Sequence, residues 1–195
     1  KIDRIEIDPE ENRKIKFQFS ISHQPGKIIL KAKDITKSFG DKHVLNSVNI
    51  EIERGEKIAF VGQNGQGKST LAKILVGELE SKGKVSLGHN VQIGYFAQNQ
   101  STYLDRTKTV IESAEDSATA ENRTKVRDLL GSFLFQGDAV DKKIHVLSGG
   151  ERNRLALCKL LLQPFNVLVM DEPTNHLDIA SKNVLKQALK KFEGT

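Results

Sequence analysis

A glycine-rich run, Gly62-Gln63-Asn64-Gly65-Gln66-Gly67-Lys68-Ser69, follows the apolar stretch Ile58–Val61 and precedes a predicted helix. Apolar strand, glycine-rich loop and helix, in this order, are the context that a P-loop requires. The glycines let successive backbone N–H groups curl around an anion, and the helix adds the positive end of its dipole. The run therefore predicts a phosphate-binding loop, with Lys68 between the β- and γ-phosphates and the Ser69 hydroxyl on Mg²⁺.

A second candidate region is the apolar run Val167–Met170, which ends in the acids Asp171 and Glu172. Strands of an α/β sheet present residues to a ligand at their carboxyl ends. We expect Asp171 to hold Mg²⁺ and Glu172 to orient and polarise an attacking water. A strand that merely ends in solvated acids is the alternative.

A third region, Leu147-Ser148-Gly149-Gly150-Glu151, places a glycine pair at the start of a predicted helix. Free N–H groups and the helix dipole at such a start favour an anion. Ser148 could equally be an ordinary N-cap residue.

Strands and helices alternate over most of the chain, and 195 residues correspond to about one domain. This alternation predicts an α/β fold with a largely parallel sheet, and residues 101–144 have the helical spacing of an inserted subdomain. The predicted strands are 28–35, 48–53, 57–61, 84–87, 91–97 and 167–170, and the predicted helices are 68–79, 151–163 and 179–192.

The N-terminal part differs from the rest, because Arg13–Lys33 contains basic residues and no acid. Apolar residues alternate with polar ones over Ile15–Ile21, so a strand with one basic, wet face is expected. The net charge is only +5, and a solvated face is a commoner explanation than an RNA-binding one. We interpret residues 1–26 as an entry strand or the end of a linker.

Neither a membrane span nor a disulfide is expected. No apolar run approaches the roughly 18–20 residues that a bilayer span needs. Cys158, the only cysteine, lies in an apolar helical stretch and is predicted to pack in the core. We therefore expect a cytoplasmic protein without direct membrane insertion.

Along the chain, the glycine-rich run is followed by Gln98, then by Leu147–Glu151, and then by the acids after Val167–Met170. This order of motifs resembles the nucleotide-binding domain of ATP-binding cassette (ABC) proteins over about residues 29–195. The resemblance implies a P-loop NTPase cassette of the ABC type, with ATP and Mg²⁺ as cofactors and a facing cassette as partner. The implied domain is 27–195, with a helical subdomain at 98–147. It also implies that the chain stops before the family's switch histidine, so that the cassette is C-terminally truncated.

The resemblance also assigns roles to individual residues. Phe39 would stack on adenine, the alternative being a core phenylalanine, and Gln98 would reach Mg²⁺ and the lytic water. Asp178 would lie in the D-loop at the contact with the facing domain. The signature residues Ser148, Gly149 and Gly150 would bind the γ-phosphate of an ATP held by that domain. The implied catalytic residues are Glu172, Gln98 and Lys68, the metal ligands are Ser69, Gln98 and Asp171, and the remaining nucleotide contacts are Gly62, Gln63, Asn64, Gly65, Gln66, Gly67 and Thr70.

Two features resemble the ABC-F class, whose soluble members carry two cassettes in one polypeptide. These features are the run from Asp171 to Asp178 and the stretch Lys14–Gly40, which is similar to the linker end before a second cassette. The resemblance implies an ATPase that acts on the ribosome or on translation, with weak or no hydrolysis by this chain alone. A subunit of an ABC transporter and a non-catalytic nucleic-acid-binding module that uses ATP as a clamp are the alternatives.

Overall fold

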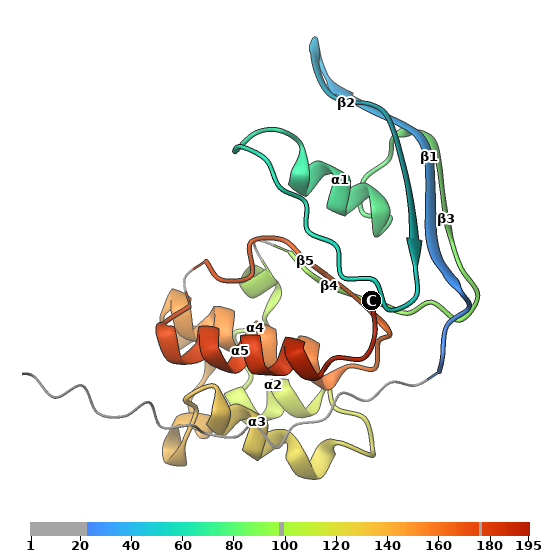
Figure 1. The fold of residues 1–195 in the computed structure, drawn as a ribbon. Helices are drawn as coiled ribbons and strands as arrows, with labels where there is room; N and C mark the ends of the chain where they lie inside the picture. Colours follow the sequence, from blue (N-terminus) through green and yellow to red (C-terminus); the bar gives the residue numbers. More distant parts are fainter. Residues whose placement is uncertain (1–22, 98–99, 176) are drawn as a thin grey trace, which may run out of the picture.

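The protein is an α/β fold with two separate sheets, seen in a computed structural model that describes residues 23–97, 100–175 and 177–195 (Figure 1). One sheet has three strands in the order β2-β1-β3, and the other pairs β4 with β5. The strands are β1 (Ile28–Phe39), β2 (Lys42–Glu53), β3 (Lys82–Leu87), β4 (Ile93–Phe96) and β5 (Val167–Met170), and the helices are α1 (Lys68–Leu75), α2 (Val110–Glu115), α3 (Val126–Ser132), α4 (Gly149–Leu162) and α5 (Ile179–Lys191). Short 3₁₀ turns occupy Gln100–Tyr103, Arg123–Lys125, Gly137–Asp141 and Ile144–Val146.

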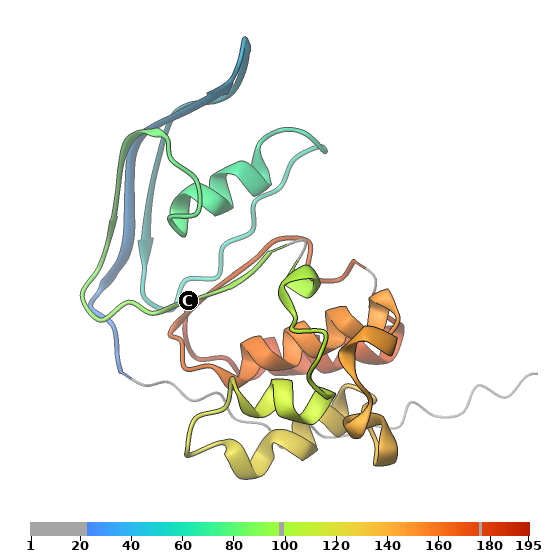
Figure 2. The ribbon, with the colours of Figure 1, turned by 180° about the vertical axis from the view of Figure 1, so that it is seen from behind.

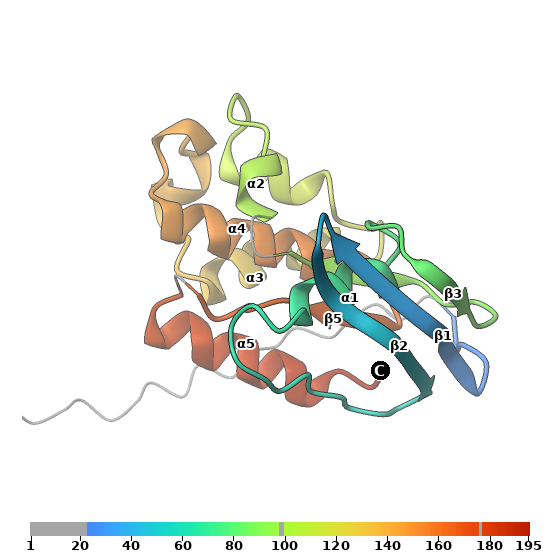
Figure 3. The same cartoon turned by 90° about the horizontal axis from the view of Figure 1, so that it is seen from above.

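The three-stranded sheet is a long hairpin with a third strand on its edge, and all its pairs are antiparallel. β1 and β2 are paired from Ile28 opposite Glu53 to Phe39 opposite Lys42. Gly40, with φ 56°, lies in the tight turn between the strands, in a conformation that glycine adopts without strain. The tip of the hairpin extends beyond the rest of the molecule at the top of Figure 1, and Figure 3 shows β2, β1 and β3 side by side from above. Phe39 is therefore carried at the tip of the hairpin.

The small sheet forms the layer between α1 on one side and α4 and α5 on the other (Figures 1 and 2). β4 and β5 run parallel, with Ile93 opposite Val167 and Phe96 opposite Met170. Successive side chains of a strand point to opposite faces. Accordingly, Val167 and Val169 pack with α1 and the hairpin, whereas Leu168 and Met170 pack against the helical cluster. The continuous apolar run Val167–Met170 thus reflects a strand that has packing partners on both faces, with Val167 buried and the other three residues half-buried.

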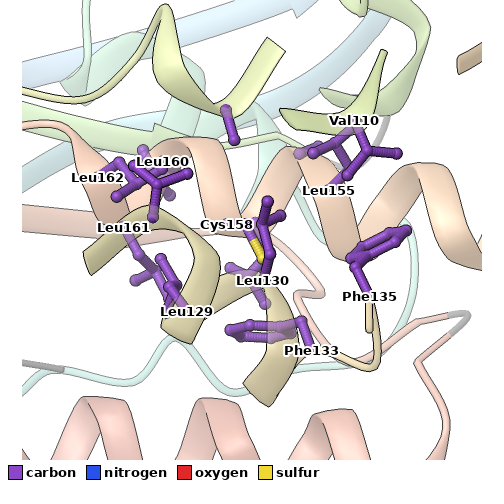
Figure 4. Packing of buried hydrophobic residues seen from close by; sticks show 14 of the residues in the cluster. Val110, Leu129, Leu130, Phe133, Phe135, Leu155, Cys158, Leu160, Leu161 and Leu162 are labelled. Atoms are coloured by element: carbon purple, nitrogen blue, oxygen red, sulfur yellow. The ribbon is translucent and has the colours of Figure 1, made fainter. Parts of the chain in front are cut away.

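The largest hydrophobic cluster lies among α2, α3, α4 and α5 (Figure 4). α4 contributes Leu155, Leu161 and Cys158, whose side chains are completely buried. The prediction that Cys158 packs in the core is therefore confirmed, and burial raises the pKa of its thiol well above the usual range. This cluster supports α4 as a rigid element.

Three sequence-based expectations about the fold are wrong. The sheet is not largely parallel, because β1, β2 and β3 pair in antiparallel fashion and, among the strands of the described residues, only β4 and β5 pair in parallel. The first helix ends at Leu75 rather than near Leu79, because Gly77 takes a left-handed conformation (φ 82°) just after its end. Lys57–Val61 forms no strand.

The segment Lys57–Val61 illustrates why an apolar run alone does not fix a strand. Ile58 and Phe60 line a cavity of about 530 Å³ that also contains Val167 and Val169 of β5, so these two stretches lie across open space from each other. Val61 is 94% exposed. A strand needs a neighbouring strand within hydrogen-bonding distance, and this segment lacks one in the described ranges. The predicted entry strand at 15–21 lies outside the described residues.

Candidate functional site

The glycine-rich loop has the left-handed backbone that its glycines permit. Gly65 and Gly67 have φ values of 82° and 87°, and Gly67 is the N-cap of α1. A Cβ added at Gly67 would lie 2.8 Å from Cγ1 of Val44, whereas one at Gly65 would meet nothing within 4 Å. The Gln66 side chain closes the loop by accepting a hydrogen bond from the Gln63 N–H at 2.9 Å. The loop therefore has a left-handed backbone at two glycines, and it packs against β2 at Gly67.

The Lys68 ammonium folds back onto this loop. Its Nζ donates to the carbonyl oxygens of Gly62 at 2.7 Å and Gln63 at 2.8 Å. Lys68 is also the first residue of α1, so its charge adds to the positive end of the helix dipole. The two effects together make this end of α1 electropositive.

A hydrogen bond joins the loop to the end of β5. The Ser69 hydroxyl donates to Oδ1 of Asp171 at 3.0 Å. Asp171 is buried, and its Oδ2 has no hydrogen-bond partner within the described part of the chain. A buried carboxylate oxygen without a partner is costly unless a cation or another donor meets it.

The Ser69 hydroxyl and the Asp171 carboxylate offer oxygen atoms of the kind that Mg²⁺ binds. Among the described residues there is no cluster of three His, Cys, Asp or Glu side chains that could hold a metal by itself. Mg²⁺ does not need such a cage, because it usually binds through one or two protein oxygens together with waters and phosphates. The donor set of Ser69 and Asp171 therefore fits Mg²⁺ held jointly with a phosphate.

Glu172 follows Asp171 with an unusual backbone. Its φ of 48° is left-handed, a conformation that costs a non-glycine residue about 1–3 kcal/mol and clusters at functional sites. Its Oε2 accepts a hydrogen bond from the side-chain amide of Asn175 at 2.6 Å.

A cavity of about 510 Å³ brings several of the sequence-predicted residues together. Phe39 stands at this cavity with 50% of its surface exposed, so it is not the core phenylalanine of the alternative interpretation. The Lys37 ammonium lies 5.3 Å from the centre of the Phe39 ring. Sequence reasoning missed Lys42 and Val44, which only the hairpin register brings here. The lining residues are Phe39, Lys42, Val44, Asn64, Gly65, Gly67, Lys68, Ser69, Thr70 and Glu172.

The Ser148-Gly149-Gly150 segment lies apart from this cavity, since none of its residues lines it. Ser148 is the N-cap of α4, and its hydroxyl accepts from the Glu151 N–H at 3.2 Å. Glu151 accepts in return from the Ser148 N–H at 2.7 Å, and this hydrogen bond lowers the pKa of Glu151. The N-cap interpretation of Ser148 is thus correct in this chain, and it leaves an anion site toward a facing domain as a prediction.

Asp178 connects α4 to α5. It caps α5 by accepting from the Ser181 N–H at 2.7 Å, and its Oδ2 lies 2.6 Å from the Arg154 guanidinium. Burial would raise the pKa of Asp178, but the hydrogen bonds from Ser181 and the charge of Arg154 outweigh it and leave that pKa lowered. Arg154 was not a sequence candidate, because nothing in the pattern pairs it with a residue so far along the chain. The other candidate, Gln98, lies outside the described residues.

The comparisons with known proteins agree with this arrangement. The family model described as ABC transporter matches residues 45–175, which include the glycine-rich loop, Ser148–Gly150 and Asp171. Among solved structures, the fold is similar to the ATP-binding cassette MJ0796 in a dimeric post-hydrolysis state bound to ADP and Pi. That match has a TM-score of 0.70 and 25% identity and covers 85% of this chain and 83% of that one.

Curated relatives are similar over nearly the whole chain. ABC transporter F family member 5 of Arabidopsis thaliana is 44% identical over 96% of this chain and 27% of its own length. The putative ATP-binding protein YdiF of Bacillus subtilis is 44% identical over 95% of this chain and 29% of its own length. The chain therefore spans less than a third of the length of these relatives. In the part of the chain that the structure describes, no helix has the length and apolar character to cross a bilayer.

Proposed function

Because the chain belongs to the ABC transporter family and is an ATP-binding cassette consistent with the ABC-F type, we propose that it hydrolyses ATP together with a facing cassette. The observation that carries the proposal is the hydrogen bond between Ser69 and Asp171. This bond sets the loop suited to phosphate beside the buried carboxylate suited to Mg²⁺. The expected reaction is attack of water on the γ-phosphate.

Each part of the cavity has a role in this proposal. The N–H groups at the start of α1 and the Lys68 ammonium bind the phosphates, and Phe39 stacks on the adenine base. Ser69 and Asp171 would hold Mg²⁺, which neutralises charge on the β- and γ-phosphates when it is bound. Glu172 accepts a hydrogen bond from the attacking water and orients it.

The ATP site on the facing cassette would include the Ser148–Gly150 segment of this chain. Ser148, Gly149 and Gly150 lie outside this chain's own P-loop cavity, so the proposal assigns them to an ATP held by the facing cassette. Asp178 would stand beside that contact. Because the composite site needs both cassettes, we expect little hydrolysis by this chain alone.

The proposed setting is a cytoplasmic ABC-F protein with two cassettes in one polypeptide, acting on the ribosome. Its support is the similarity to relatives named as ABC transporter F family members and the run from Asp171 to Asp178. In this setting the chain would be the second cassette, preceded by linker residues 1–26. Residues 98–147 would be its helical subdomain.

The test of the ATPase role compares Lys68→Ala and Glu172→Gln in the two-cassette protein. Lys68→Ala should abolish ATP binding, and Glu172→Gln should retain binding but block turnover. Undiminished hydrolysis by Glu172→Gln would contradict the role of Glu172.

The test of the ribosome role is co-sedimentation with ribosomes at physiological salt. The Glu172→Gln protein should remain bound in the presence of ATP and dissociate in its absence. Retention that does not depend on ATP, or no retention, would contradict the translation role and leave the ATPase assignment to be judged by turnover.

A further inference from the structure

We propose that Asn175 is a positioning residue that holds the Glu172 carboxylate for the attack on ATP. The inference rests on the proposed ATPase function and names a residue beyond it. Asn175 contacts Glu172 twice. Its side-chain Nδ2 donates to Oε2 at 2.6 Å, and its backbone N–H donates to the Glu172 carbonyl oxygen at 3.1 Å.

The two contacts have different functions. The backbone bond closes a four-residue turn, Glu172-Pro173-Thr174-Asn175, in which proline occupies the second position that turns favour. Proline fixes its own φ near −65° and so rigidifies this turn without any help from the Asn175 side chain. The turn therefore does not need the side-chain hydrogen bond, which instead restrains the carboxylate of Glu172.

The backbone of Glu172 explains why the carboxylate needs support. A left-handed φ of 48° sends the side chain of Glu172 in a direction that the flanking strand geometry does not set. Glu172 and Asn175 are both exposed, so burial does little to restrict the carboxylate, and a hydrogen bond can set its position. A neutral amide donor at 2.6 Å can fix one oxygen of the carboxylate in the wall of the cavity that also contains Lys68 and Ser69.

A small displacement of the Glu172 carboxylate would lower the rate of ATP hydrolysis. Misplacing a reacting group by about 1 Å can lower the rate by roughly a hundredfold, because the attack requires a narrow range of distances and angles. The phosphates are proposed to bind to Lys68 and the N–H groups at the start of α1, and not to Glu172. Loss of Asn175 should therefore reduce kcat and leave ATP binding intact.

The experiment measures kcat and KM for ATP in the two-cassette protein with Asn175→Ala and Asn175→Asp. Asn175→Ala should lower kcat by roughly 10- to 100-fold at unchanged KM. Asn175→Asp should be worse than alanine, because it has nearly the same shape but replaces the donor with a second carboxylate beside Oε2. A merely structural role predicts the reverse order, since aspartate suits turns better than alanine does.

The matched control is Asn183→Asp, the same chemical change at an exposed position of α5. It should leave kcat unchanged. A double-mutant cycle adds a second comparison, because Asn175→Ala should cause no further loss in the slow residual single-turnover rate that is measured in the Glu172→Gln background.

The outcomes separate this inference from the proposed function. Absence of hydrolysis in the unmodified protein, or full activity of Glu172→Gln, overturns the proposed function and the positioning role with it. If Glu172→Gln is inactive, then full activity of Asn175→Asp, a changed KM, or additive losses in the cycle overturn the role of Asn175 alone.

Discussion

Replacing Gly67 by alanine should damage nucleotide binding more than the same change at Gly65. Both positions are left-handed, with φ values of 87° and 82°, and this conformation costs an L-residue about 1–2 kcal/mol. At Gly67 the new Cβ would also lie 2.8 Å from Cγ1 of Val44 and 3.3 Å from its carbonyl oxygen. Overpacking of this kind typically adds about 1–3 kcal/mol. The expected penalties are therefore about 1–2 kcal/mol at Gly65 and about 2–5 kcal/mol at Gly67.

The assay is equilibrium binding of Mg²⁺-ATP, with denaturant unfolding of each variant to separate binding from stability. If the loop relieves its strain by moving out of the binding conformation, Kd rises about tenfold for each 1.4 kcal/mol. This predicts an increase of roughly 5- to 30-fold for Gly65→Ala and of at least about 30-fold for Gly67→Ala. Equal effects at the two positions would refute the role of the Val44 contact, and no effect at either would refute the described loop.

Three further predictions concern other parts of the molecule. Because the folded state lowers the pKa of Asp178, this carboxylate contributes stability above the ordinary Asp pKa of about 3.9, and the contribution is lost as the pH falls through the lowered value. Asp178→Asn should therefore flatten the acid side of the stability-against-pH curve measured by urea unfolding, and an unchanged curve would contradict the hydrogen bonds with Ser181 and the pairing with Arg154. Gly131→Ala in α3 should raise the free energy of unfolding by about 0.5–1 kcal/mol, because an added Cβ meets nothing within 4 Å; a loss of stability would indicate different packing. Phe39→Ala should weaken ATP binding by about 0.5–1.5 kcal/mol with only a small loss of thermal stability, because half of the residue's surface is already exposed; unchanged ATP binding would contradict the stacking role.

The sequence was most informative where the backbone imposes strict requirements. Gly65 and Gly67 have the positive φ values that the loop pattern demands, and Asp171 directly follows the strand that its apolar run implied, although only Val167 of that strand is buried. Both features depend on local chemistry, so a local pattern can predict them.

Features that depend on distant contacts could not be predicted from the sequence. The pair between Arg154 and Asp178 joins two helices, and nothing local in either segment indicates it. The run Lys57–Val61 looked like a buried strand, but whether such a run pairs depends on the distance to β5, across a cavity of about 530 Å³. Asn175 was visible in the sequence, yet its contact with Glu172 required the left-handed backbone of that residue.

The most direct test of the central claim is calorimetric titration of this chain with ATP, with and without Mg²⁺, beside a Ser69→Ala, Asp171→Asn double variant. The unmodified chain should bind ATP saturably, and Mg²⁺ should strengthen that binding, because Ser69 and Asp171 supply the protein oxygens for the ion. In the double variant the Mg²⁺-dependent part of the affinity should disappear. An equal effect of Mg²⁺ on both proteins would contradict the assignment of this site.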